Sequence, residues 1–467
     1  MDAAGLAFAG ISRQAELIRA GEVSSRELTG ALLDRIGRLD PELNAFRVVM
    51  AEEALAEADA RDGAAEVGRG PLHGVPVAIK DENDVAGQVT TFGGSSQSTP
   101  AAEDGVATAR LRAAGAVIIG KTNLSEFGQW PFTESQTFGY TRNPWDPTRT
   151  AGGSSGGSAV ATAAGMVGAA LGGDGGGSIR IPAACCGLFG LKPQLGRVSF
   201  APAPALWGGL GTIGPLTRRV EDSALFYDVV RGAAPGDRFQ PPEPPMSFGE
   251  AARTEPGRLR IAVSTKPTVP FVGLDREQRA ALESVAGTLR ELGHEVGEAD
   301  PDYPDTTAAF TPQYLGGVRT EAEMVEHPER LERRTKQTAA VARLLPRASF
   351  EWAIRRGVRQ AAEVNAFFDD WDLLLTPTIP SQPRRLGALD GVGFLGAVVR
   401  SQPMVAYCAV WNLFGNPAAS VPAGTSSAGL PLAVQLVGAP NDEPTILQAA
   451  AQLERELGWP ERRPPAS

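Results

Sequence analysis

Residues 151–182 read AGGSSGGSAVATAAGMVGAALGGDGGGSIRIP, and this stretch decides the organisation of the chain. It places two glycine-flanked serines, Ser154 and Ser178, on either side of a segment of small residues. Glycine allows backbone turns with positive φ, and it lets another group approach main-chain N–H groups without a Cβ in the way. The run 159–171 predicts a tightly packed, buried helix. We therefore interpret the stretch as a folded site and reject a flexible Gly/Ser linker.

Length and charge limit the class of protein. A chain of 467 residues leaves both one large α/β domain with insertions and two domains open. The formal net charge of −10 argues against a nucleic-acid partner, which would favour a basic face. No apolar run approaches the roughly 18 residues of a membrane span, and the first 25 residues lack the pattern of a secretory signal. We expect a soluble, cytoplasmic enzyme that binds neither nucleic acid nor membrane.

Cysteine usage gives no sign of a disulfide framework or a metal site. Cys185 and Cys186 are adjacent and Cys408 is distant, with no CxxC or His-rich spacing. We predict that the three cysteines are buried apolar residues, and that the protein binds no metal.

Strands and helices alternate along most of the chain, which favours an α/β fold. Residues 11–63 have helical periodicity, with a capping box at Ser24–Glu27. The apolar runs 75–79 and 116–119 predict the first strands. Residues 301–347 are charged and irregular, without a usable motif. Further helices are predicted at 222–231, 275–292, 352–371 and 443–457, and further strands at 259–264, 294–299, 372–376 and 431–437.

Two short motifs point to other functions, and their context argues against both. Residues 115–122, GAVIIGKT, match the phosphate-binding pattern GxxxxGK[ST], but the variable positions Ala, Val, Ile and Ile are expected to form the strand itself. Residues 152–156 match the nucleophile pattern GxSxG, which needs a preceding strand, whereas residues 143–150 are turn-rich with two prolines. A histidine-based triad also lacks candidates, because we expect both histidines that follow the serines, His294 and His327, to face solvent.

Five motifs together resemble the amidase signature family of serine hydrolases. They are the central GGSSGGS and GDGGGSIRIPA, the upstream GVPVAIKDE at 74–82, and the downstream DLLLTPTIP at 372–380 and GLPLAVQLVG at 429–438. They occur in the family's order and cover most of the chain. The resemblance implies one large α/β domain with a central mixed β-sheet surrounded by helices. It also implies hydrolysis of a linear or cyclic amide C–N bond to an acid plus an amine or ammonia, without a cofactor.

The resemblance also implies roles for individual residues. Ser178 corresponds to the nucleophile, Ser154 to the bridging serine in a cis peptide, and Lys80 to the base. We expect the N–H groups of Gly175, Gly176 and Gly177, with that of Ser178, to stabilise the oxyanion of an acyl-enzyme reaction. Supporting roles fall to Ser155 and Asp174, and Gly128 corresponds to a substrate-lining position. The candidates for the walls of the substrate pocket are Trp130, Phe132, Trp207, Tyr314 and Trp411.

The same resemblance divides residues 1–467 into segments of one domain. N-terminal helices occupy 1–65, the catalytic core 66–234, a linker and variable insertion 235–350, and the C-terminal part of the core 351–467. We expect a small-molecule amide as partner and leave a homodimer open.

Three departures from the family's pattern affect the loops near the serines. The family commonly has threonine at Gly173 and Gly175 and proline at Ala151, so we expect these loops to be more flexible than in the family. Two alternatives remain. One is the A subunit of glutaminyl-tRNA amidotransferase, which usually has glutamine where this chain has Ile181. The other is a catalytically silent binding protein that keeps the fold.

The base is expected to act as a neutral amine. Burial at the end of an apolar strand lowers the pKa of a lysine. If no carboxylate lies near Lys80, we expect its pKa to fall well below about 10.4 and kcat/KM to rise with pH through that lowered value.

Overall fold

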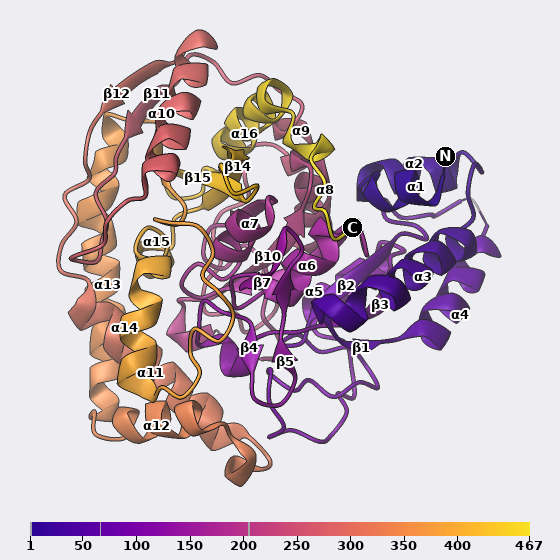
Figure 1. Cartoon of the computed structure of the whole chain (residues 1–467), viewed down its shortest axis with the longest axis horizontal. Coiled ribbons are helices and arrows are strands. Elements are labelled where there is room, and N and C mark those ends of the chain that lie inside the picture. Colours follow the sequence, from indigo (N-terminus) through magenta and orange to yellow (C-terminus); the bar gives the residue numbers. More distant parts are fainter. Residues whose placement is uncertain (1, 66, 204–205) are drawn as a thin grey trace.

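The computed structural model describes residues 2–65, 67–203 and 206–467. An 11-stranded mixed sheet runs through the centre of these residues, and helices lie on both sides of it (Figure 1). The predicted α/β class with a central mixed sheet surrounded by helices is confirmed. In the view of Figure 1, the helices of residues 3–62 lie at one end of the molecule and those of residues 307–405 at the other.

Strand order in the large sheet is β1-β3-β2-β8-β10-β9-β14-β15-β13-β11-β12. The pairs β2·β3, β2·β8, β11·β12 and β11·β13 are parallel, and the others are antiparallel. The strands of this sheet are β1 (Phe46–Val49), β2 (Pro76–Lys80), β3 (Val117–Thr122), β8 (Ala169–Asp174), β9 (Phe189–Lys192), β10 (Thr212–Thr217), β11 (Arg260–Val263), β12 (Glu295–Glu298), β13 (Leu373–Pro377), β14 (Ala418–Thr425) and β15 (Pro431–Gly438). Two small ribbons are formed by β4 (Glu134–Ser135) with β5 (Gly139–Tyr140), and by β6 (Arg142–Asn143) with β7 (Asp146–Thr150).

Sixteen α-helices are assigned within the described residues. They are α1 (Ala3–Phe8), α2 (Ile11–Arg19), α3 (Ser25–Leu43), α4 (Ala51–Asp62), α5 (Val106–Ala113), α6 (Gly156–Ala163), α7 (Arg180–Cys186), α8 (Val220–Val230), α9 (Phe248–Ala251), α10 (Arg276–Glu291), α11 (Thr307–Met324), α12 (Arg333–Ala342), α13 (Arg347–Asn365), α14 (Phe394–Val405), α15 (Ala409–Phe414) and α16 (Glu443–Leu457).

The central strands are buried on both faces. Every residue of β2, β3, β8, β10 and β15 is buried, so these strands are mainly apolar and show no regular alternation of polar and apolar residues. This is why the runs 75–79, 116–119 and 431–437 could be recognised as strands. The predicted capping box is also confirmed: the Ser24 side chain accepts from the Glu27 N–H at the start of α3, and the Glu27 carboxylate accepts from the Ser24 N–H.

Three predictions of local structure are wrong. Residues 11–63 are not helical throughout, because β1 (Phe46–Val49) lies between α3 and α4. The run 159–171 is not one helix: α6 ends at Ala163, and β8 begins at Ala169. A positive φ of 68° at Gly165 accompanies the change of direction, and small residues suit both elements. Residues 301–347 are not irregular, because α11 and α12 lie there. Charged residues of this segment are exposed at Arg333 and Lys336 but buried at Arg334, so they do not mark one face of a helix in the sequence.

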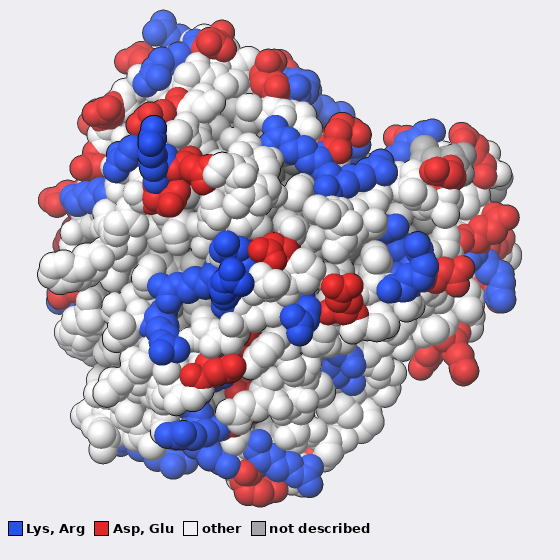
Figure 2. All heavy atoms as spheres, in the orientation of Figure 1, with Lys and Arg blue, Asp and Glu red and all other residues white. Residues whose placement is uncertain are grey.

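The three cysteines are buried and unpaired, as predicted. Both signs of charge occur over the face shown in Figure 2. Across the described residues, no helix is both long and apolar enough to cross a membrane. In the same part of the chain, no group of three or more His, Cys, Asp or Glu residues is arranged to hold a metal ion.

Candidate active site

Lys80 is the last residue of β2, and its side chain is 1% exposed. Its Nζ donates to Ser154 Oγ at 2.9 Å and to the Gly173 carbonyl at 3.4 Å. The third neighbour is a carboxylate, because Glu82 Oε2 lies 2.9 Å from Nζ. Residues from three distant parts of the chain therefore meet at one buried amine.

The assumption that no carboxylate lies near Lys80 is wrong. The chain turns directly after β2, where the Glu82 N–H donates to the Lys80 carbonyl at 2.8 Å, and this turn brings the Glu82 side chain back to the amine. Burial lowers the pKa of Lys80 from its ordinary value, while Glu82 and then Asp174 act to raise it. The balance between burial and Glu82 sets the charge of the amine.

Asp81, between these two residues, faces away from Lys80. Its carboxylate pairs with Lys121 at 2.7 Å and with Arg47 at 3.2 Å. Successive side chains at the end of a strand point in opposite directions. Asp81 is therefore separated from the Glu82 carboxylate that contacts Lys80. Lys121 is the lysine of the GxxxxGK[ST] pattern, and it lies within β3 as part of a structural ion pair.

Ser154 precedes α6, and the Gly153–Ser154 peptide bond is cis. Contrary to expectation, a strand does precede this serine, but β7 belongs to a two-stranded ribbon and not to the large sheet. Gly153 is required here, since a Cβ at this position would lie 2.6 Å from the Phe132 nitrogen. The close approach fixes the segment that carries Ser154.

Ser155 connects the two serine segments. Its N–H donates to the Ser178 carbonyl at 3.2 Å, and its hydroxyl donates to the Gly173 carbonyl at 3.0 Å. Ser178 is therefore held beside Ser154 and Ser155, and is 8% exposed.

Asp174, at the end of β8, is fully buried beneath the loop that carries Ser178. Its carboxylate accepts from the Gly177 N–H at 2.6 Å, from Arg180 Nε at 3.0 Å and from Asn412 Nδ2 at 2.9 Å. Burial alone would raise the pKa of Asp174, but the Arg180 guanidinium and these hydrogen bonds hold it well below its ordinary value. The carboxylate is thus ionised and orients the loop.

The Asp174 contact narrows the set of oxyanion donors. Because the Gly177 N–H is bound to Asp174, it is not available to a substrate, and Gly177 is removed from the expected donors. The N–H groups of Gly175, Gly176 and Ser178 remain as candidates.

Three polar residues of this network were missed in the sequence. Arg180 donates to Gln435 Oε1 at 2.8 Å and to Asn412 Oδ1 at 2.6 Å. A signal existed for two of them, because Arg180 lies in the GSIRIPA motif and Gln435 in the GLPLAVQLVG motif. Asn412 lies in no motif.

Aromatic side chains and one acid surround the glycines before Ser178. A Cβ at Gly175 would lie 3.0 Å from the Trp207 ring, and one at Gly176 would lie 3.7 Å from the Phe310 ring. Tyr314 packs edge-on to Trp207 with ring centroids 5.1 Å apart, and the Trp207 Nε1–H donates to Glu321 at 3.2 Å. The helix α11, from the segment without a motif, thus supplies part of the wall.

The other expected wall residues are packed in the hydrophobic clusters of the interior. Trp411 is 1% exposed and packs against Tyr303 and Phe414, while Trp130 and Phe132 belong to the main hydrophobic core. Gly128 is close to Ser154 and Glu82, because a Cβ there would lie 3.0 Å from Ser154 Oγ and 3.7 Å from Glu82 Oε2.

The histidines contact neither serine in their described hydrogen bonds. His294 is buried and not solvent-facing as expected, and it bridges the Leu259 N–H and Gln452. His327 contacts Ser98, and His73 contacts the Arg61 carbonyl.

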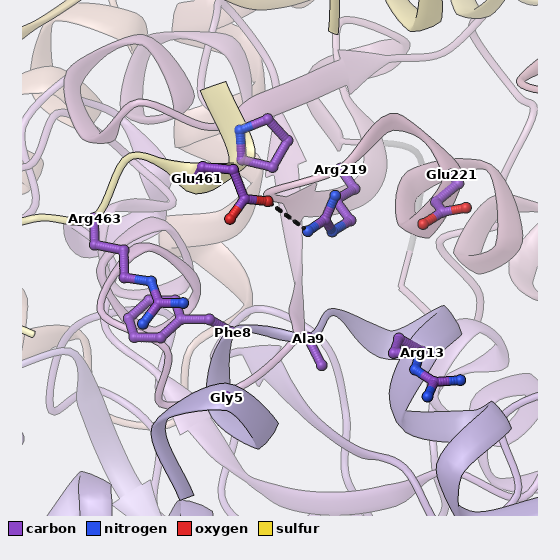
Figure 3. Close-up of a pocket in the computed structure, with 9 residues that line it drawn as sticks. Gly5, Phe8, Ala9, Arg13, Arg219, Glu221, Glu461 and Arg463 are labelled. Carbon is purple, nitrogen blue, oxygen red and sulfur yellow. Dashed lines mark hydrogen bonds and ion pairs between the residues drawn. The ribbon is translucent and has the colours of Figure 1, made fainter. Parts of the chain in front are cut away.

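A separate surface pocket lies between the N-terminal helices and the C-terminal segment (Figure 3). Arg463 lies over the Phe8 ring at 4.4 Å from its centroid, and Arg219 pairs with Glu461 at 3.1 Å. The pocket lining includes neither serine of the candidate site and no residue that contacts Lys80.

A buried serine–lysine pair lies beside a glycine loop on a mixed sheet surrounded by helices, and the fold together with this site is that of a hydrolase of the α/β class. The Amidase family model matches residues 27–447, which is most of the chain. The chain belongs to the amidase signature family, and it is an amidase.

The sequence similarity to known proteins extends over nearly the whole chain. The chain is 46% identical over 476 residues to the "Putative amidase AmiB2" of Mycobacterium tuberculosis, with all of both chains covered. It is 36% identical to the 6-aminohexanoate-cyclic-dimer hydrolase of Paenarthrobacter ureafaciens, covering 97% of this chain and 95% of the relative. A structure of 6-aminohexanoate cyclic dimer hydrolase complexed with substrate has a TM-score of 0.93, 34% identity, and coverage of 98% of this chain and 99% of that one.

Proposed function

We propose that the protein hydrolyses a carboxylic amide through Ser178, Ser154 and Lys80, with an acyl-enzyme intermediate. The observation that carries the proposal is the 2.9 Å hydrogen bond between Lys80 Nζ and Ser154 Oγ at a fully buried amine. Because a hydroxyl both donates and accepts, Ser154 relays a proton between the nucleophile and the lysine.

The reaction proceeds in two halves. Ser178 Oγ attacks the amide carbonyl while its proton passes to Ser154, and the proton of Ser154 passes to the neutral Lys80 amine. The C–N bond then breaks as the departing nitrogen takes a proton back along the same path, which leaves an ester on Ser178. Water attacks that ester by the same relay and releases the acid.

Main-chain donors stabilise the negative charge that develops on the carbonyl oxygen. Gly175, Gly176 and Ser178 have N–H groups in the loop oriented by Asp174. One such donor typically contributes roughly 3–4 kcal/mol to the transition state.

We propose linear and cyclic amides as the substrate class. The support is the similarity to a cyclic-dimer hydrolase over nearly the whole chain, together with the aromatic wall of Trp207, Phe310 and Tyr314. An apolar wall beside the nucleophile suits an aliphatic or aromatic chain next to the amide.

Covalent labelling tests the mechanism before the substrate is identified. A fluorophosphonate probe is expected to modify Ser178, as located by peptide mass spectrometry, and Ser178→Ala is expected to abolish labelling. Labelling that survives Ser178→Ala would refute the assignment. A panel of aryl amides, aliphatic amides and cyclic diamides then identifies the substrate; complete silence of the folded protein would favour a binding protein.

A further inference from the structure

Glu82 is the one carboxylate in contact with Lys80 among the described residues, and its two oxygens have different surroundings. Oε2 lies 2.9 Å from Lys80 Nζ. Oε1 is buried and has no hydrogen-bond partner among the described residues. The side chain is 10% exposed. Apart from its contact with Lys80, the Glu82 carboxylate is therefore positioned by packing and not by hydrogen bonds.

Gly173 provides the space for this carboxylate, and Gly128 borders it at ordinary contact distance. A Cβ at Gly173 would overlap Glu82 Oε1, and no other atom lies within 3.0 Å of that Cβ position. On the other side, a Cβ at Gly128 would lie 3.7 Å from Oε2 and 3.0 Å from Ser154 Oγ. Gly173 has no positive φ, so its backbone does not require glycine. The carboxylate of Glu82 is the physical reason for a glycine at this position.

The departure from threonine at Gly173 thus has a local cause. A threonine side chain would occupy the place of Oε1 and displace the carboxylate from the amine. Glu82 and Gly173 form a matched pair, in which the glycine admits the acid.

We propose that Glu82 is a positioning residue of the serine–lysine site, which lies in the space left by Gly173, holds the Lys80 amine toward Ser154 and sets its protonation state. The proposal rests on the proposed function of Lys80 as the base. A carboxylate in contact with a buried amine favours the ammonium form, so Glu82 places the pH at which Lys80 becomes active.

Other charges near Lys80 are accounted for. Asp174 lies on β8, acts on Lys80 at longer range and is already paired with Arg180. Glu321 on α11 interacts with Glu82 and not directly with the amine; burial raises its pKa to about 8, so it is largely uncharged at neutral pH. Glu82 is consequently the main ionic partner of Lys80.

The test uses the second-order rate of fluorophosphonate labelling of Ser178 as a function of pH, measured on the full chain. In the wild type the rate is expected to rise with pH as Lys80 loses its proton. In Glu82→Gln the charge is lost but the size is kept, so the rising limb is expected to move at least about one unit to lower pH. An unchanged limb in this variant would overturn the proposal.

Gly173→Ala provides an independent variant that leaves the acid in the sequence. The added methyl group is expected to displace the carboxylate and move the limb in the same direction as Glu82→Gln. In the double variant Glu82→Gln with Gly173→Ala, the two shifts of the rising limb are expected not to add, because no charged carboxylate remains for the methyl group to displace. Additive shifts would refute the role of Gly173.

Asp84→Asn is the matched control, since it removes a charge from the same loop at a residue bonded to Thr90. Its pH profile is expected to match the wild type, and a shift as large as that of Glu82→Gln would refute a specific effect of Glu82. Failure of the underlying mechanism is distinguishable, because then labelling would persist in Ser178→Ala or Lys80→Ala whatever the residue at position 82. Circular dichroism of each variant verifies folding.

Discussion

Asp174→Asn probes the ion pair beneath the nucleophile loop. Asp174 and Arg180 are both fully buried and 3.0 Å apart. The substitution keeps the size of the side chain but removes the charge, so the Arg180 guanidinium is left buried without its counter-ion. Breaking such a pair from one side typically costs about 3–5 kcal/mol of unfolding free energy. The Gly177 N–H also loses a charged acceptor, so labelling of Ser178 is expected to slow.

Urea denaturation followed by tryptophan fluorescence measures the loss. Because the folded pKa of Asp174 lies well below its ordinary value of about 3.9, the stabilisation is present above that value and is lost as pH falls through the folded pKa. The deficit of the variant is therefore expected to be constant between about pH 8 and pH 5.

Two further variants make the result specific. Glu16→Gln breaks the exposed pair with Arg13 and is expected to leave the unfolding curve in place. Adding Arg180→Met to Asp174→Asn removes the unpaired charge and is expected to recover part of the loss. A deficit below about 1 kcal/mol for Asp174→Asn would refute the view that the pair is the buried, desolvated contact described here.

Three other predictions concern the loop, the relay and the reaction. Gly177→Ala is expected to lower the midpoint of thermal unfolding strongly, because φ is +121° and the new Cβ would lie 2.6 Å from Ile181. The control Gly176→Ala meets only ordinary contacts and is expected to unfold at the wild-type temperature. Equal midpoints for the two variants would contradict the prediction. Ser154→Ala is expected to reduce the labelling rate less than Lys80→Ala, since a water molecule is able to replace a hydroxyl but not the base; the reverse order would argue against the relay. Glutamine hydrolysis, assayed by ammonia release, is expected to be unaffected by added amidotransferase subunits, and a marked stimulation would instead favour the A-subunit alternative.

The central strands and the candidate reacting residues could be predicted because each leaves a local signal. The strand 75–79 is a continuous apolar run that ends at Lys80, and the serines stand among glycines. The 2.9 Å contact between Lys80 and Ser154 agrees with the family-based expectation, while the roles of these residues stay proposals.

What could not be predicted depends on contacts between distant segments. Glu82 has the sequence context of a surface acid, and only the turn after β2 directs it to Lys80. The donor set could not be narrowed either, because the bond from the Gly177 N–H to Asp174 follows from the loop conformation. The helix α11 was not predicted because apolar residues recur only weakly at helical spacing in its sequence, so the contribution of Phe310 to the site had no sequence signal.

The position of α11 separates two properties of the enzyme. Lys80, Ser154 and Ser178 belong to segments fixed to the sheet, whereas Phe310 and Tyr314 come from a helix outside it. We therefore expect substitutions of Phe310 and Tyr314 to change the shape of the proposed substrate wall without displacing the proposed proton relay, whereas Glu321 on the same helix interacts with Glu82. If the proposed wall is correct, libraries confined to Phe310 and Tyr314 are expected to alter substrate selectivity through one helix outside the sheet.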